Sequence, residues 1–333
     1  MKAPKPPVLR TSERTAFRRC NKRWEWAYLC GLQSKQKPAS ALWFGLGIHE
    51  ALANWYGEGF DRGAVPADTW EDWTEGEIRY IKANFADHDR EWFDEPVYEQ
   101  ATELGIAMLD HYLEVYDDDP KLEILAIEQP FEIEIVDEQG QVIAIFRSRF
   151  DGVAINHQFN HIELLEHKTA ASIKLQHLPL DDQAGAYFAV ATLVLRHQGI
   201  LSKREHIEGI NYNFLRKSRP DRRERNNAGA YLNKNGSISK RQPPPAFIRE
   251  FVDRSPREVK QQIRRIADEV TVMNKMRSGE LPILKSITDM CPSCPFFDMC
   301  RLHERGGTAW QEFRDLHYTV VNPYGDDRKS AAG

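Results

Sequence analysis

The sequence predicts an α/β protein in which a mixed central sheet is flanked by helices. Apolar residues recur at helical spacing in the first third of the chain, whereas apolar and polar residues alternate after Pro120, as in a half-buried sheet. Further along the chain, apolar residues at helical spacing occur again between segments with the strand pattern. With 333 residues, 41% of them hydrophobic, the chain can bury a sizeable core. We therefore expect one large α/β unit.

The N-terminal portion is expected to be helical. The segment LWFGLGIHEALANWY carries its apolar residues on one helical face, and two acidic, aromatic-rich segments follow the same pattern. The three expected helices span residues 42–56, 69–85 and 98–116. The chain ends, 1–10 and 323–333, are rich in proline or in small polar residues and are expected to be flexible, which leaves 11–322 as a single domain.

The middle of the chain predicts a sheet with a helix packed against it. Residues 123–155 alternate around the turn signal Asp-Glu-Gln-Gly at 137–140, which is typical of two antiparallel strands. A second turn leads into a strand expected at 162–168. The elements expected after it are a helix at 181–196, a strand at 207–215 and a long helix at 256–277.

Charge and hydropathy narrow the class of protein. No stretch approaches the roughly 18 uncharged apolar residues that a membrane span requires, and the N-terminal residues lack the apolar stretch of a secretory signal. We therefore expect a soluble, cytoplasmic protein without a membrane partner. The net charge of -5 offers polyanions no general attraction, so any binding of nucleic acid must depend on a local basic surface.

The five cysteines lie only near the two ends of the chain. Their odd number argues against a secreted disulfide framework. Cys291, Cys294 and Cys300 follow the spacing C-x2-C-x5-C among prolines, which is typical of metal ligands. Three thiolates of this kind need a fourth, from Cys20 or Cys30.

The strongest chemical pattern lies in the expected sheet. Asp151 precedes the strand that carries Glu166 and Lys168, and because strand side chains alternate, these two project from one face. Two carboxylates can hold a hard divalent cation, while the lysine stabilises developing negative charge or orients a water. The pattern indicates phosphodiester hydrolysis. The alternative is a surface pair on an edge strand, with Asp151 in a turn.

In this order the residues resemble the PD-(D/E)xK nucleases of the RecB type, which include the AddB nuclease domain, CRISPR-associated iron-sulfur exonucleases and phage recombination exonucleases. Gly45 and His49 match the G-x3-H motif, Asp151 the metal-binding aspartate, Glu166 and Lys168 the E-x-K pair. Gln183 and Tyr187, on one face of the next helix, match Q-x3-Y. The resemblance runs nearly end to end and implies a restriction-endonuclease-like fold.

The resemblance also implies roles for these residues. His49, Asp151, Glu166 and the carbonyl of His167 would hold Mg²⁺ or Mn²⁺, and Lys168 would assist the attacking water. Gln183 and Tyr187 would position the scissile phosphate or the DNA strand. The alternatives are a partly buried helix histidine at position 49 and simple helix packing at 183 and 187.

The cysteines resemble the iron-sulfur variant of this family. Cys20 begins a segment, CNKRWEWAY with Gly-Leu following, that has the shape of the first-ligand motif apart from a missing proline. This implies a [4Fe-4S] cluster, with Zn²⁺ as the alternative, in a C-terminal cluster segment that folds back onto the N-terminus. The implied ligands are Cys20, Cys291, Cys294 and Cys300. Cys30 is expected to be a small buried hydrophobe.

A basic loop offers a local surface for DNA. Between Arg216 and Arg241 nine Lys or Arg stand against two acidic residues, within an expected insertion at 216–245. Contacts to phosphates are independent of base sequence. The candidates are Arg222, Arg223, Arg225, Lys240 and Arg241 of the loop, with Lys260 and Arg264 of the following helix. The alternative is a solvated insertion.

Taken together, these patterns and the resemblance favour a metal-dependent DNA nuclease. We expect an exonuclease of single-stranded DNA or duplex ends, active in recombination, repair or phage DNA processing, with a helicase or a strand-annealing protein as a further partner. A catalytically silent DNA-binding subunit is one alternative, but the acidic pair and the lysine are all present. A zinc-stabilised interaction protein is the other.

Overall fold

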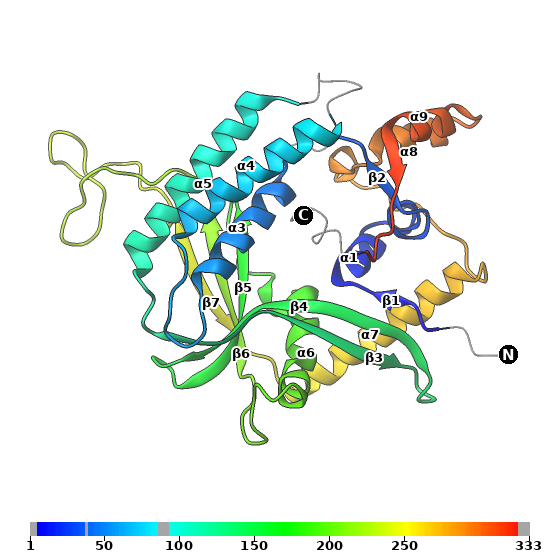
Figure 1. Cartoon of the computed structure of the whole chain (residues 1–333), viewed down its shortest axis with the longest axis horizontal. Coiled ribbons are helices and arrows are strands. Elements are labelled where there is room, and N and C mark those ends of the chain that lie inside the picture. The colour runs from blue at the N-terminus through cyan, green and yellow to red at the C-terminus, as the bar shows by residue number, and fades with distance from the viewer. Residues whose placement is uncertain (1–4, 37–38, 86–92, 326–333) are drawn as a thin grey trace.

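A six-stranded mixed sheet forms the centre of the molecule (Figure 1). The computed structural model describes residues 5–36, 39–85 and 93–325. The strands are β1 (Val8–Leu9), β3 (Leu122–Val136), β4 (Val142–Asn156), β5 (His161–Ala170), β6 (Gly209–Arg216) and β7 (Phe247–Val252). β5 and β6 are parallel, as are β1 and β4, whereas β3–β4, β4–β5 and β6–β7 are antiparallel.

The long strand β4 changes partner along one edge. Ile145 and Phe146 pair with β1, whereas the residues from Gly152 onward pair with β5. β3 covers the other edge throughout. The stretch of β4 between its two partners contains both Ser148 and Asp151.

Three helices cover one face of the sheet: α3 (Ala41–Trp55), α4 (Pro66–Phe85) and α5 (Glu95–Tyr116). Their core contains the fully buried Trp70 and includes Leu165 of β5. Gly47 of α3 lies against this core so closely that a Cβ there would stand 2.4 Å from the Trp73 ring and 2.5 Å from Trp70. The absence of a side chain at position 47 is therefore what lets α3 approach α4.

The opposite face is covered by α1 (Thr11–Arg19), α6 (Asp182–His197), which follows the short turn η3 (Leu178–Leu180), and α7 (Pro256–Arg277). α7 begins at a capping box formed by Ser255 and Glu258. The core on this side includes Leu164 of β5. Adjacent residues of β5 thus enter different cores, as strand alternation requires.

The two ends of the chain form a third small cluster, which we call the cysteine module. β2 pairs with β8 antiparallel, and Trp26, Phe296 and Tyr318 pack together. Its elements are α2 (Asn21–Trp24), the π-helical turn η1 (Glu25–Leu29), β2 (Leu32–Ser34), η4 (Cys291–Ser293), α8 (Phe297–Glu304), α9 (Ala309–His317) and β8 (Tyr318–Val320).

The structure confirms the predicted fold class, a mixed sheet flanked by helices. The three N-terminal helices and the helix at 256–277 occur where expected. The short strands β1, β2, β7 and β8 were not predicted. A flexible end was expected through residue 10, but Val8 and Leu9 form β1, and Leu9 is buried. Residues 1–4 and 326–333, which belong to the expected flexible ends, lie outside the described residues.

Within the ranges that the structure describes, no helix combines the length and the apolar character that crossing a membrane requires.

Candidate active site

β4 and β5 part at the predicted carboxylates. Their pairing ends at Gly152 and Leu165, so Asp151 and Glu166, one step further, are not ladder partners. Instead, the backbone N–H of His167 donates to Oδ2 of Asp151 at 2.9 Å. A side chain therefore takes the place of a ladder bond, and the two carboxylates lie at the point where the strands separate.

His49 brings the helix α3 into this site. Its Nδ1 lies 3.4 Å from Oδ2 of Asp151. Burial raises the pKa of Asp151. The charge and hydrogen bond of His49, together with the His167 N–H, more than offset this effect and lower the pKa to about 2. Burial lowers the pKa of His49, and Asp151 more than offsets this, so that it lies above its ordinary value. Asp151 therefore favours the protonated form of His49, and the two form an ion pair whenever His49 is protonated.

Glu166 and Lys168 point from the same face of β5, as predicted. Lys168 Nζ donates to Oε1 of Glu166 at 2.6 Å, and the Glu166 side chain is 4% exposed. Burial, together with the charge of Asp151, raises the pKa of Glu166 to about 7 although Lys168 opposes the rise. Burial lowers the pKa of Lys168, but Glu166 raises it well above its ordinary value. A cation that binds Glu166 must therefore displace a proton at slightly acidic pH.

Gln183 and Tyr187 of α6 also reach this site. Lys168 Nζ donates to Oε1 of Gln183 at 3.2 Å, and Nε2 of Gln183 donates to the Tyr187 hydroxyl at 3.5 Å. Tyr187 also packs edge-on against Phe131 and Phe150. The structure thus places both predicted residues beside Lys168, and Tyr187 serves in packing as well.

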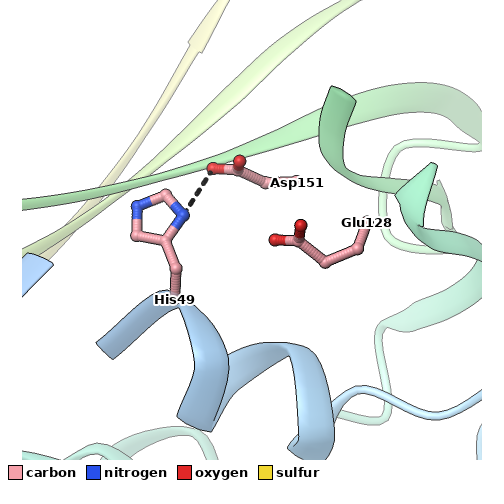
Figure 2. A group of neighbouring side chains, drawn as sticks. All are labelled: His49, Glu128 and Asp151. Atoms are coloured by element: carbon pink, nitrogen blue, oxygen red, sulfur yellow. Dashed lines mark ion pairs between the residues drawn. The ribbon is translucent and has the colours of Figure 1, made fainter. Parts of the chain in front are cut away.

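Sequence reasoning missed Glu128. His49, Glu128 and Asp151 each offer one ligand atom, and these three atoms lie within 4.8 Å of one another. Figure 2 shows the three side chains converging. Glu128 lies between the β3 residues that pair with Phe150 and Gly152 and has a left-handed φ of 48°. Its Oε2 accepts from Arg149 at 2.8 Å. Counting back from the turn at 137–140 would have placed Glu128 opposite Arg149, because the observed pairing of Val136 with Val142 and the register shift beside it each move the partner by one residue.

The side chain of His167 lies on the α3 side of β5, where its ring packs edge-on against that of His49, with 6.0 Å between the ring centroids. It lies in the core under α3, stacked on Tyr56, and its Nδ1 is 3.0 Å from Nδ2 of Asn213. Burial lowers the pKa of His167 to about 3. The imidazole is therefore held in this core, and the role predicted for His167 depends on its main-chain carbonyl.

Four of the five cysteines converge in the cysteine module. The backbone N–H of Ser286 donates to Cys20 Sγ at 3.4 Å, and Cys291 Sγ lies 3.9 Å from the Ser286 carbonyl. Cys300 lies near enough to Cys20 and Cys294 for their charges to act on its pKa, which burial raises. Cys30 is exposed, beside Glu25 and Lys22. Its expected burial is therefore wrong, because the turn after η1 directs it to solvent.

Several residues of the basic loop already have acidic partners. The loop joins β6 to β7 and projects from the body of the molecule (Figure 1). Arg222 pairs with Glu114 of α5 at 2.7 Å, and Arg223 with Asp221 at 2.7 Å. Arg225 stacks on the Tyr231 ring at 4.3 Å. The side chains of Lys240 and Arg241 are exposed and form no ion pair among the described residues, although the charge of Arg241 helps to lower the pKa of Asp221.

The candidate residues on α7 belong to another layer. Lys260 and Arg264 are exposed on the outer side of this helix, and Arg264 lies 3.9 Å from Glu138. α7 packs on α6 and on β3 and β4, whereas the loop is tied to α5 across the sheet. The two basic sets are therefore carried on opposite sides of the sheet.

Fold and site together support a nuclease. The chain belongs to the PD-(D/E)XK nuclease superfamily, because the model of that family matches residues 11–301. The mixed sheet flanked by helices is consistent with its restriction-endonuclease-like fold.

Individual proteins are only distantly similar. Among solved structures, the chain is similar to a presumed exonuclease from Eubacterium rectale, with 12% sequence identity and a TM-score of 0.43. The similarity covers 86% of this chain and 87% of that one. No curated protein is similar enough to count as a match.

Proposed function

We propose that the chain is a metal-dependent deoxyribonuclease of the RecB/AddB type that acts as an exonuclease. The observation that carries the proposal is the convergence of Asp151, Glu166 and Lys168 where β4 and β5 part. The pKa of one carboxylate is lowered and that of the other is raised, and both lie beside a partly buried ammonium. Such an arrangement is typical of an active site. Membership of the nuclease superfamily supports the same conclusion.

The donor set fits a divalent cation. Asp151, Glu166 and the carbonyl of His167 would hold Mg²⁺ or Mn²⁺, with His49 and Glu128 beside them. Imidazole among carboxylates favours Mn²⁺ over Mg²⁺. The cation would supply Lewis-acid activation and neutralise phosphate charge.

The residues of the chain would provide the rest of the chemistry. Lys168 keeps its ammonium beside Glu166 and Gln183, where it would orient the attacking water and stabilise the charge that develops on the phosphate. Asp151 keeps its charge over the whole physiological range, because its pKa is about 2.

DNA is the proposed substrate. Lys240, Arg241 and Lys260 are exposed cations that could contact phosphates without regard to base sequence. Recombination, repair and phage DNA processing are the processes that we propose, with a helicase or a strand-annealing protein acting on the same single strands.

We also propose a [4Fe-4S] cluster on Cys20, Cys291, Cys294 and Cys300. The sulfurs come from both ends of the chain yet share neighbours at Ser286 and Cys300. Backbone N–H groups donate to Cys20 from Ser286 and to Cys291 from Thr288, each at 3.4 Å, which stabilises thiolate charge. Such a cluster would cross-link the two halves of the cysteine module.

The central test is cleavage of DNA labelled at either end, single-stranded and duplex, with Mn²⁺ or Mg²⁺. The wild-type protein should release nucleotides progressively from an end. Glu166→Gln and Lys168→Ala should lose at least about a thousandfold in rate, since each removes a charge that the transition state needs. Glu134→Gln, an exposed carboxylate on β3, is the matched control and should retain activity.

Two outcomes would overturn the proposal. DNA binding without cleavage under every metal condition would make the chain a silent DNA-binding subunit. Cleavage that survives in both Glu166→Gln and Lys168→Ala would place the active site elsewhere.

A further inference from the structure

A chain of hydrogen bonds leads away from Lys168 along one face of the sheet to the start of α1. Its first links are Lys168 to Gln183 and Gln183 to Tyr187. Beyond them, the Tyr187 hydroxyl lies 2.8 Å from Oγ of Ser148, and Ser148 lies 3.3 Å from Oγ1 of Thr11. These hydrogen bonds therefore join β5, α6, β4 and α1.

The direction of the first two hydrogen bonds follows from the chemistry of Lys168. A lysine ammonium has donors only, so the oxygen of the Gln183 amide faces Lys168 and its nitrogen faces Tyr187. The Tyr187 hydroxyl then accepts from Gln183. It is also hydrogen-bonded to the hydroxyls of Ser148 and Thr11, which are hydrogen-bonded to each other.

The location of the last two residues explains how they can hold the others in place. Ser148 lies on β4 between the stretch that pairs with β1 and the stretch that pairs with β5. Thr11 is the first residue of α1, directly after β1, and is 6% exposed. Tyr187 is also 6% exposed. The terminal links are therefore largely shielded from water, where an unmade hydrogen bond costs most.

We propose that Ser148 and Thr11 are positioning residues for the reaction, which fix the Tyr187 hydroxyl and through Gln183 the direction of the Lys168 ammonium. This inference rests on the proposed function. Glu166 and Gln183 take two of the three N–H groups of Lys168, and the third remains for the water or the phosphate. A rotated Gln183 amide would present a donor to this ammonium and turn it away.

The kinetic test is a double-mutant cycle on cleavage of a labelled single-stranded oligonucleotide with Mn²⁺. Ser148→Ala should lower kcat about fivefold, the value of one hydrogen bond, with KM little changed. Tyr187→Phe should lower it more, and the double variant should match Tyr187→Phe alone. Ser148→Thr, which keeps the hydroxyl, should recover most of the rate. Thr11→Val should have a smaller effect, because Ser148 still holds the Tyr187 hydroxyl.

The matched control is Thr15→Ala, which removes a hydroxyl one turn further along α1. That hydroxyl bonds to the carbonyl of Thr11 within the helix, so kcat should not change. Multiplicative losses in the double variant would overturn the proposal, because independent effects multiply. An equal loss of kcat in Ser148→Ala and in Thr15→Ala would also overturn the proposal.

A spectroscopic measurement tests the hydrogen bonds without catalysis. In protein labelled with ¹⁵N-lysine, the ammonium resonance of Lys168 can be assigned by its loss in Lys168→Arg. It should shift in Ser148→Ala and in Tyr187→Phe but not in Thr15→Ala. An unmoved resonance in Ser148→Ala would overturn the inference, whereas a shifted resonance in a protein that does not cleave DNA would contradict only the proposed function.

Discussion

The backbone N–H of His167 donates to Oδ2 of Asp151, so a β5 amide that would otherwise pair within the sheet binds a β4 side chain. This bond couples the aspartate to the residue between Glu166 and Lys168. The imidazole of the same residue is anchored in the opposite core by Asn213 and Tyr56. One residue thus links Asp151 of β4 to the core beneath α3.

His167 should make stability depend on pH. Its pKa is about 3 in the folded protein and about 6.5 unfolded, so between these values the unfolded chain holds one more proton. The free energy of unfolding should therefore fall by about 1.4 kcal/mol for each pH unit below about 6.5 through this group. His167→Gln should lack this component.

Urea unfolding of both proteins in EDTA, at several pH values from 7.5 to 5, would measure the difference. Glu166, whose raised pKa gives a component of opposite sign, is present in both and cancels. Parallel curves for the two proteins would contradict the prediction.

Glu128 should contribute to metal affinity. Its carboxylate lies with His49 and Asp151, so Glu128→Gln should weaken Mn²⁺ binding by at least about tenfold, as removal of supporting groups at metal sites does. Electron paramagnetic resonance of free Mn²⁺ would measure it. Glu132→Gln is a close control, because Glu132 also pairs with a β4 arginine, Arg147, but lies outside this group. Equal affinities in both variants would exclude Glu128 from the site.

The two glycines of α3 should respond oppositely to alanine. A Cβ at position 47 would meet the rings of Trp70 and Trp73, so Gly47→Ala should cost about 1–3 kcal/mol. A Cβ at position 45 would meet only the Thr169 hydroxyl, at 3.6 Å. Gly45→Ala should therefore be neutral or stabilise by up to about 1 kcal/mol through helix propensity. Thermal unfolding of the two variants would decide, and equal destabilisation would contradict the packing argument.

Of the two N-terminal cysteines, only Cys20 should be a ligand of the iron-sulfur cluster proposed for the cysteine module. Protein purified without oxygen should be brown, and Cys20→Ser should lose iron and destabilise the chain. Cys30→Ser should keep its iron, because Cys30 is exposed and its charged neighbours are Glu25, Lys22 and Arg314. Metal analysis and visible absorbance would measure both. A colourless protein with one zinc would rule out the cluster, and iron loss from Cys30→Ser would mean that the ligand is misassigned.

The basic loop should contribute to DNA binding through Lys240 and Arg241. Lys240→Gln with Arg241→Gln should flatten the slope of log affinity against log salt by roughly 0.7 to 0.9 for each phosphate that the variant no longer neutralises. Arg222→Gln with Arg223→Gln should change it less, because Glu114 and Asp221 already neutralise those charges. Fluorescence anisotropy over a salt series would compare them. An identical slope in wild type and both variants would show that the loop does not bind phosphates.

Local patterns were enough to predict the parts of the site that lie within one element. Glu166 and Lys168 share a face because strand side chains alternate, and Gln183 and Tyr187 share one because a helix turns every 3.6 residues. These periods follow from backbone geometry and are visible in any sequence. The helices of the N-terminal portion and the mixed sheet were predictable for the same reason.

Relationships between distant segments depend instead on how the elements pack. The convergence of Glu128 with His49 requires the register of β3 against β4 and the approach of α3, for which Gly47 makes room. The hydrogen bond between Ser148 and Tyr187 requires that one edge of β4 be unpaired at Ser148, between the residues that pair with β1 and those that pair with β5. Packing between elements sets such registers, and a shift of one residue would turn each side chain to the other face. Local sequence therefore specified which groups carry the chemistry, whereas packing between distant elements set which of those groups meet.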